Sequence, residues 1–223
     1  MTDSRLRELE RRFRSTGAVV DEAARLAERA RVGELPVAAL DLAAYLGSVA
    51  ARLALAGDVA LAPESEAEWL IGLHDRDPVL WVRALIAAAG LVLTRFRQAR
   101  PGELAPLHAL EAAEAWCIRP CLEHAVAVLG GRGLSSFATA DYGGADAALT
   151  QAGWALEHAA AAAWLVEQGR SPSPRYGPMN VLTSLEFNGI NPSELRQAVA
   201  QELIPFVLGE SDALRARVES REA

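Results

Sequence analysis

Residues 77–102 read DPVLWVRALIAAAGLVLTRFRQARPG, and this stretch decides the fold class. It opens on Asp77 and Pro78, a pair typical of a helix N-cap followed by the first helical residue. It closes on a Pro-Gly pair, which ends a helix. The sequence therefore predicts a helix over about Val79 to Gln98, the longest clear helix of the chain.

The apolar centre of this helix predicts that it is buried. The run from Ala84 to Leu93 is the longest apolar run of the chain, and Arg83 and Arg95 flank it closely. Its length is about half of what a helix needs to cross a bilayer. We therefore expect a helix inside a protein core and no membrane partner.

Composition extends the helical prediction to the rest of the chain. Alanine and leucine make up about a third of the 223 residues, and Val, Ile and Thr are far fewer. Alanine and leucine lose little side-chain freedom in a helix, whereas β-branched residues lose more. No stretch shows convincing strand periodicity. We expect an all-α fold of about ten helices, either an irregular multi-helix bundle or a HEAT-like stack of helix pairs.

Two other tetrapeptides predict where helices start. Ser65 and Glu68 have the spacing of a capping box in front of an apolar run. Residues 191–194 read NPSE, which combines an N-cap, a proline at the first helical position and a glutamate three residues after the cap. Both segments are therefore expected to open a helix.

A Pro/Ser-rich segment divides the chain. Residues 171–178 read SPSPRYGP, which is typical of an extended linker, and we expect a weakly structured stretch over 179–190 after it. The predicted organisation is a helical core domain over 1–169, a linker and loop over 170–190, and a C-terminal helical pair over 191–223 that packs on the core. This pair is expected to act as a lid or to mediate a homodimer.

The charged residues exclude several classes of chemistry. All 22 basic residues are arginine, so the chain has no lysine for a Schiff base or for a Walker-type phosphate loop. The net charge of -7 argues against a nucleic-acid binder, because such a protein must neutralise phosphates. The charged N-terminus lacks the apolar core of a signal peptide, and two cysteines are too few for a disulfide framework. We expect a cytoplasmic protein without a cofactor.

Cys117, Cys121 and His124 form a candidate metal site. Their spacing of i, i+4 and i+7 places them on one face if a single helix holds all three, and two cysteines with one histidine are a known catalytic zinc set. Pro120 lies between the cysteines, and we expect it to end the first helix and to separate the side chains. We therefore interpret the cysteines as structural, with a metal-dependent enzyme as an alternative.

An acidic segment is the candidate partner-binding site. Between residues 58 and 77 six carboxylates stand against one arginine, without the ligand order of a calcium loop. One interpretation is a solvated connection with helix caps. The other is a surface that docks a basic protein partner and speeds the encounter. The candidate residues are Glu64, Glu66, Glu68, Trp69, Asp75 and Asp77. The sixth carboxylate of the segment is Asp58, which is not among the candidates.

Two stretches resemble known protein families. Residues 21–55, with DEAARL, GEL, LAAYLG and AARLAL, resemble the N-terminal part of uncharacterised helical proteins from high-GC bacteria. The run ALEAAEAW at 109–116, with the alanine-rich helices up to Trp164, is similar to the Imm-5-like helical family of immunity proteins in bacterial polymorphic toxin systems. His158 matches in part the histidines that this family places in such helices. The resemblance implies a small cytosolic protein that acts by binding another protein.

These observations favour a non-enzymatic protein-interaction module, and the resemblance adds the role of a toxin neutraliser. The sequence contains no hydrolase nucleophile elbow, no zincin motif and no di-iron bundle motif. The first alternative is a helical scaffold or signalling adaptor with a groove between helix pairs. The second alternative is the metal-dependent enzyme described above.

Overall fold

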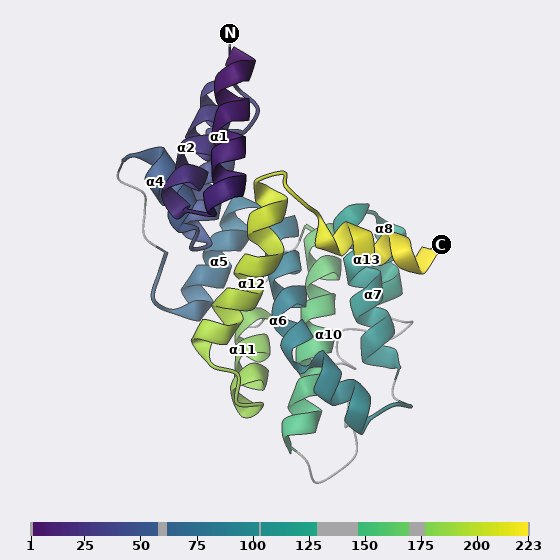
Figure 1. Cartoon of the computed structure of the whole chain (residues 1–223). Helices are drawn as coiled ribbons and strands as arrows, with labels where there is room; N and C mark the ends of the chain where they lie inside the picture. Colours follow the sequence, from purple (N-terminus) through teal and green to yellow (C-terminus); the bar gives the residue numbers. More distant parts are fainter. Residues whose placement is uncertain (1, 58–61, 103, 129–146, 170–176, 223) are drawn as a thin grey trace. The chain divides into compact units, whose positions relative to one another are not determined.

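The computed structural model describes residues 2–57, 62–102, 104–128, 147–169 and 177–222. These residues form twelve α-helices and no strand, which confirms the predicted all-α fold (Figure 1). The helices are α1 (Thr2–Thr16), α2 (Val19–Arg31), α3 (Val37–Tyr45), α4 (Val49–Leu55), α5 (Glu66–Arg76), α6 (Pro78–Ala99), α7 (Ala105–Ile118), α8 (Leu122–Val128), α10 (Ala147–Glu167), α11 (Gly177–Phe187), α12 (Pro192–Val207) and α13 (Ala213–Glu222).

Side-chain caps begin two of these helices where the sequence predicts them. The Asp77 carboxylate accepts a hydrogen bond from the Val79 amide at 2.8 Å and so caps α6. At the start of α12 the Asn191 side chain accepts from the Glu194 amide at 3.0 Å, and the Glu194 carboxylate accepts from the Asn191 amide at 2.9 Å. This reciprocal pair is a complete capping box, which satisfies amides that a helix start leaves open.

The chain folds as two compact units. The first unit consists of residues Met1–Ala62 and Ala200–Asp212, and the second consists of Pro63–Val199 and Ala213–Ala223. The boundaries therefore differ from those expected at residues 169 and 191. Each unit combines segments that are far apart in the sequence, so composition shifts along the chain do not mark them.

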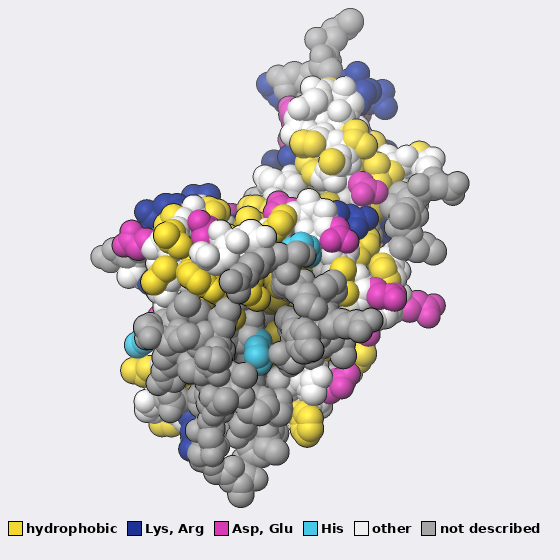
Figure 2. All heavy atoms as spheres, turned by 180° about the vertical axis from the view of Figure 1, so that it is seen from behind, with side chains coloured by type: hydrophobic (Ala, Val, Ile, Leu, Met, Phe, Trp, Pro, Cys, Tyr) yellow, Lys and Arg dark blue, Asp and Glu magenta, His cyan; other side chains and the backbone are white. Residues whose placement is uncertain are grey.

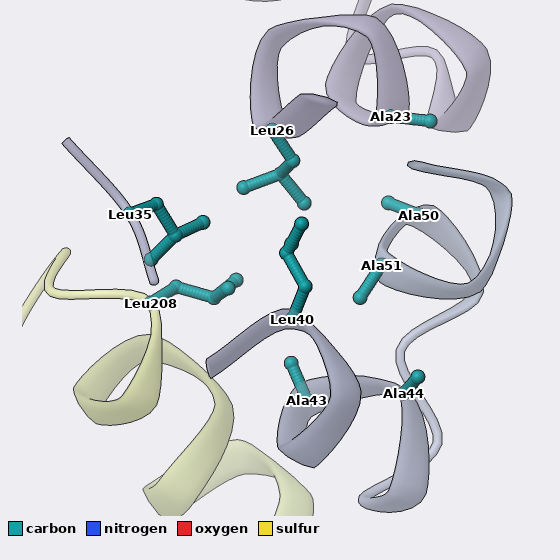
Figure 3. Close-up of a cluster of buried hydrophobic side chains, with 9 residues drawn as sticks. All are labelled: Ala23, Leu26, Leu35, Leu40, Ala43, Ala44, Ala50, Ala51 and Leu208. Atoms are coloured by element: carbon teal, nitrogen blue, oxygen red, sulfur yellow. The ribbon is translucent and has the colours of Figure 1, made fainter. Parts of the chain in front are cut away.

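The first unit is built on four leucines that converge in its core (Figure 3). Helix α2 packs against α1 and α4, and α3 packs against α4. Leu26, Leu35 and Leu40 come from the N-terminal helices and their connections, and Leu208 comes from the segment that follows α12. Small side chains surround them and let the helices approach closely. They are Ala23, Ala43, Ala44, Ala50 and Ala51.

Two arginines of α2 fix the segment that carries Leu208. Arg29 donates from Nη1 to the Leu208 carbonyl at 3.1 Å, and Arg25 forms an ion pair with Glu210. The Arg25 side chain also lies over the Phe13 ring, with 5.2 Å between Cζ and the ring centroid. Arg25 is only 9% exposed, so its charge depends on neighbours such as these for compensation.

Helices α6 and α10 form the centre of the second unit. Helix α6 packs against α5, α7, α10 and α11, and α10 also contacts α7, α8 and α11 (Figure 1). The face of α10 that meets its neighbours consists largely of alanine, and two tryptophans that are 1% exposed, Trp81 and Trp116, add large apolar side chains. The buried alanines of α10 are Ala152, Ala155, Ala159, Ala160, Ala161, Ala162 and Ala163.

Among the described residues, α6 is the one helix that is long and apolar enough to span a membrane by length and composition alone. In this structure 61% of its most apolar window is buried by the rest of the chain. Four helices of the second unit cover it, which agrees with the buried core helix expected from the sequence.

The prediction of a weakly structured stretch over 179–190 is wrong for most of its length. Helix α11 spans Gly177–Phe187, so its first two residues, Gly177 and Pro178, belong to the segment 171–178 that the sequence predicts to be an extended linker. Val181 and Leu185 of this helix are buried, and α11 packs against α5, α6 and α10. Tertiary packing of these apolar side chains therefore stabilises a helix that composition alone does not indicate. The rest of the predicted linker, residues 170–176, lies outside the described residues.

We predict that Leu208→Ala destabilises the first unit by about 2–5 kcal/mol, because the substitution leaves a cavity among Leu26, Leu35 and Leu40. Urea unfolding followed by circular dichroism measures the change. The matched control is Leu53→Ala in the same unit, where the leucine is 52% exposed and the expected change is within about 0.5 kcal/mol. Equal effects of the two substitutions would contradict the prediction.

Candidate functional site

The acidic segment forms the start and the exposed side of α5. Ser65 caps this helix, since its hydroxyl accepts a hydrogen bond from the Glu68 amide at 3.4 Å. This contact confirms the predicted helix start, although the long distance indicates a weak bond. The predicted carboxylate Asp58 lies outside the described residues.

Arg196 of α12 binds the beginning of this segment. Its Nε donates to the Glu66 carboxylate at 3.2 Å, and its Nη2 donates to the carbonyls of Pro63 at 2.6 Å and Glu64 at 2.8 Å. The same guanidinium lies over the Trp69 ring, with 5.0 Å between Cζ and the ring centroid. One side chain thus joins a carboxylate, two carbonyls and an aromatic ring, which a guanidinium can do and an ammonium cannot.

These contacts remove three residues from the predicted binding set. Trp69 is 1% exposed and lies beneath Arg196, so it is a core residue. Glu66 is paired with Arg196, and Asp77 caps α6. For these three residues the structure supports the first interpretation of the acidic segment, in which they serve as a helix cap or in packing and not as partner-binding residues.

Three predicted residues remain on the surface. Glu64, Glu68 and Asp75 are exposed, and none of them pairs with an arginine in the described part of the chain. Glu68 and Asp75 are seven residues apart on α5, so they lie on the same face of the helix, two turns from each other. The Asp75 carboxylate lies 3.5 Å from Nδ1 of the neighbouring His74. The exposed face of α5 therefore carries a carboxylate at each end of a two-turn stretch, and the exposed Arg76 follows Asp75 in the sequence.

Acidic side chains do not form one continuous patch on the face of the molecule that Figure 2 shows. In that view the described carboxylates alternate with hydrophobic and other side chains. A partner that recognises charge would therefore meet local groups of carboxylates such as the exposed face of α5.

A hollow of about 220 Å³ lies beside the start of α5. Two carboxylates line it, those of Glu66 and Glu186, and so do the first residues of α5 and α12. Helix starts carry partial positive charge, which offsets the carboxylates. The hollow therefore selects neither an anion nor a cation by charge. The remaining lining residues are Ser65, Ala67, Leu182, Thr183, Leu185, Ile190, Asn191, Pro192 and Leu195.

The described residues do not bring Cys117, Cys121 and His124 together as a group of metal ligands. Cys117 is buried near the end of α7, and Cys121 lies in the turn before α8. Nδ1 of His124 is 3.0 Å from the Arg119 carbonyl, a backbone contact that orients the ring. No group of three or more metal-ligating side chains occurs among the described residues, which include all three candidates. A break between α7 and α8 lies around Pro120, where the sequence predicts that the first helix ends.

A second hollow, of about 450 Å³, lies in the first unit and was not predicted from the sequence. Three arginines and three glutamates line it, so their formal charges cancel. The arginines Arg25 and Arg29 are already bound to Glu210 and to the Leu208 carbonyl. The hollow is therefore a consequence of this structural clamp. Its lining residues are Glu10, Phe13, Arg14, Arg25, Arg29, Glu34, Gly209 and Glu210.

Comparison of the chain with protein-family models, with curated proteins and with solved structures finds no match. The resemblance to the immunity-protein family stays a prediction.

We predict that Arg196→Ala destabilises the second unit by about 1–3 kcal/mol, because Glu66 and two carbonyls lose a donor and Trp69 loses its cover. Arg196→Lys is expected to recover less than half of the loss, since an ammonium cannot make all the contacts at once. Urea unfolding measures both variants. Arg95→Ala is the control, because Arg95 is exposed and makes no ion pair in the described part of the chain. A full recovery by lysine would show that charge alone matters.

We predict that the protein loses stability as the pH falls below 6.5, in part because of His158 on α10. Burial lowers the pKa of His158 below its ordinary value of 6.5. The unfolded chain therefore binds a proton in a range where the folded chain does not, and acid favours unfolding. The contribution is at most about 1.4 kcal/mol between pH 6.5 and pH 5.5. Urea midpoints of wild type and His158→Gln at both values measure it, and an unchanged pH dependence in the variant would contradict the prediction.

Proposed function

We propose that the protein is a non-enzymatic module that binds another protein, and that its partner is a basic protein that it neutralises. The observation that carries this proposal is a set of exposed carboxylates on α5 and just before it: Glu64, Glu68 and Asp75 are not paired with an arginine in the described part of the chain. Unpaired surface carboxylates raise the rate at which a basic partner associates and help to select it. The net charge of -7 acts in the same direction.

The resemblance to immunity proteins supports the narrower role of a toxin neutraliser in the bacterial cytoplasm. An immunity protein acts by covering its partner, so it needs a complementary surface and no reaction centre. The geometry of Cys117, Cys121 and His124 does not support the metal-dependent enzyme, because the three side chains do not form a ligand group.

The test compares two variants that carry the same net charge. The first, called the α5 variant, replaces the exposed carboxylates on α5 and just before it by Glu64→Gln, Glu68→Gln and Asp75→Asn. The second is a control that removes three other exposed carboxylates that no arginine pairs in the described part of the chain: Glu8→Gln, Glu34→Gln and Glu123→Gln. The wild-type protein is first used to capture proteins from a lysate of the source organism at low and at high salt. Candidates for the partner are the proteins that it retains only at low salt.

We predict that the purified partner associates with the α5 variant about tenfold more slowly than with wild type, while the control variant stays within about twofold. Surface plasmon resonance at two salt concentrations measures both rates. Growth of cells that express the partner, with and without this chain, then tests neutralisation. Equal rates for the two variants would show that total charge matters and that α5 is not the site.

A further inference from the structure

The hollow of about 220 Å³ beside the start of α5 presents an apolar wall to solvent. Helices α5, α11 and α12 of the second unit all contribute to it (Figure 1). Leu185 and Leu195 are buried in this wall, and Leu182 and Ile190 are half-buried. Since more than half of the lining residues are apolar, contact with another apolar group would remove this wall from water.

The polar groups beside this wall are mostly bound within the chain. The Ser65 hydroxyl caps α5, and both the side chain and the amide of Asn191 take part in the capping box of α12. Pro192 has no amide hydrogen to donate. The Glu66 carboxylate is held by Arg196. A polar ligand would therefore find few free partners in the hollow, whereas an apolar group needs none.

The volume of the hollow suits a single side chain. Pockets that hold drug-sized ligands measure about 300 to 1,000 Å³, which is more than the volume of about 220 Å³ found here. An apolar cavity of about 150 Å³ holds a benzene molecule. The hollow therefore has room for one aromatic or branched aliphatic side chain.

Unpaired carboxylates flank the hollow. Glu186 lines it and is exposed, and Glu64 directly precedes the lining residue Ser65. Neither carboxylate is paired with an arginine in the described ranges of the chain. Phe187, which is 57% exposed, lies one turn after the lining residue Thr183 on the same side of α11. An apolar residue with basic neighbours would thus be complementary to this surface in both polarity and charge.

We propose that this hollow is the pocket for one apolar side chain of the basic protein partner, and that basic residues next to that side chain contact Glu64 and Glu186. A central apolar anchor inside a polar rim is the arrangement that supplies most of the binding energy in many protein interfaces. The inference rests on the proposed function, because it names the part of the basic partner that the chain holds. It adds α11 and the start of α12 to the candidate site on α5.

The first test uses three tripeptides with blocked ends and the full-length wild-type protein. Their sequences are Arg-Leu-Arg, Arg-Gly-Arg and Glu-Leu-Glu, and NMR follows the backbone amides of Thr183, Glu186 and Ile190 during each titration. We expect saturable shifts with Arg-Leu-Arg. Arg-Gly-Arg should bind at least about tenfold more weakly because it lacks the apolar side chain, and Glu-Leu-Glu at least about threefold more weakly because like charges meet. No saturable shifts, or equal affinity of either control peptide, would overturn the proposal.

The second test fills the hollow. Thr183 is an exposed lining residue, so Thr183→Trp should occupy the space and weaken binding of Arg-Leu-Arg at least about tenfold. The control is Gln197→Trp, an exposed position on α12 two residues from Leu195 and hence on the other side of that helix, where affinity should stay within about twofold. Circular dichroism checks that both variants fold, and the peptide series on the wild-type protein decides the question if Thr183→Trp does not.

The captured partner separates this inference from the proposed function. Filling the pocket should raise the dissociation rate of the partner at least about tenfold and leave its association rate nearly unchanged, whereas the α5 variant acts on association. A partner that depends on the α5 carboxylates but dissociates from Thr183→Trp at the wild-type rate would overturn the pocket and leave the proposed function intact. Peptide binding at the hollow without any salt-sensitive partner would support the pocket and contradict the proposed function.

Discussion

Close approach of helices through alanine is the constraint on which the second unit depends. Helix α10 presents seven buried alanines and packs against α6, which has buried alanines of its own. Small side chains let two helices approach closely, but each one removes little apolar surface from water. Large buried side chains must therefore supply much of the apolar burial, and Trp69, Trp81 and Trp116 do so at 1% exposure each. The alanine-rich composition and the few buried tryptophans are two parts of the same packing solution.

Arginine, the only basic residue type besides histidine, fastens segments that are distant in the sequence. Arg25 and Arg29 hold the segment after α12, Arg196 holds the chain before α5, and Arg217 with Arg221 holds α13. In each case the guanidinium has several donors, so it can bind a carboxylate together with a carbonyl, a second carboxylate or an aromatic face. The chain has no lysine, which excludes a Schiff base and a Walker-type phosphate loop. Its arginines instead bind segments that are distant in the sequence.

The sequence predicts local features well because they depend on neighbouring residues. The caps at Asp77 and Asn191 and the break at Pro120 follow from contacts within a few positions, and all are found in the structure. Helix α11 was missed because tertiary packing stabilises it. The Arg25–Glu210 pair joins residues 185 positions apart, and no local pattern marks such a contact. For the same reason the sequence could not show that Trp69 lies under Arg196 while Glu68 and Asp75 stay exposed.

The distribution of carboxylates decides how the acidic charge can be used. A carboxylate that caps a helix or pairs with an arginine contributes little to a partner, because its charge is already compensated. The net charge of -7 therefore overstates what a partner would meet, and only exposed carboxylates that no arginine pairs, such as Glu68 and Asp75 of α5, would contribute fully. Such charges mainly raise the rate of association, whereas tight binding needs apolar contact as well. On α5 this contact is available from Ile71, which lies half-buried between Glu68 and Asp75 on the same face of the helix. A partner suited to this surface would thus combine basic side chains with an apolar residue between them.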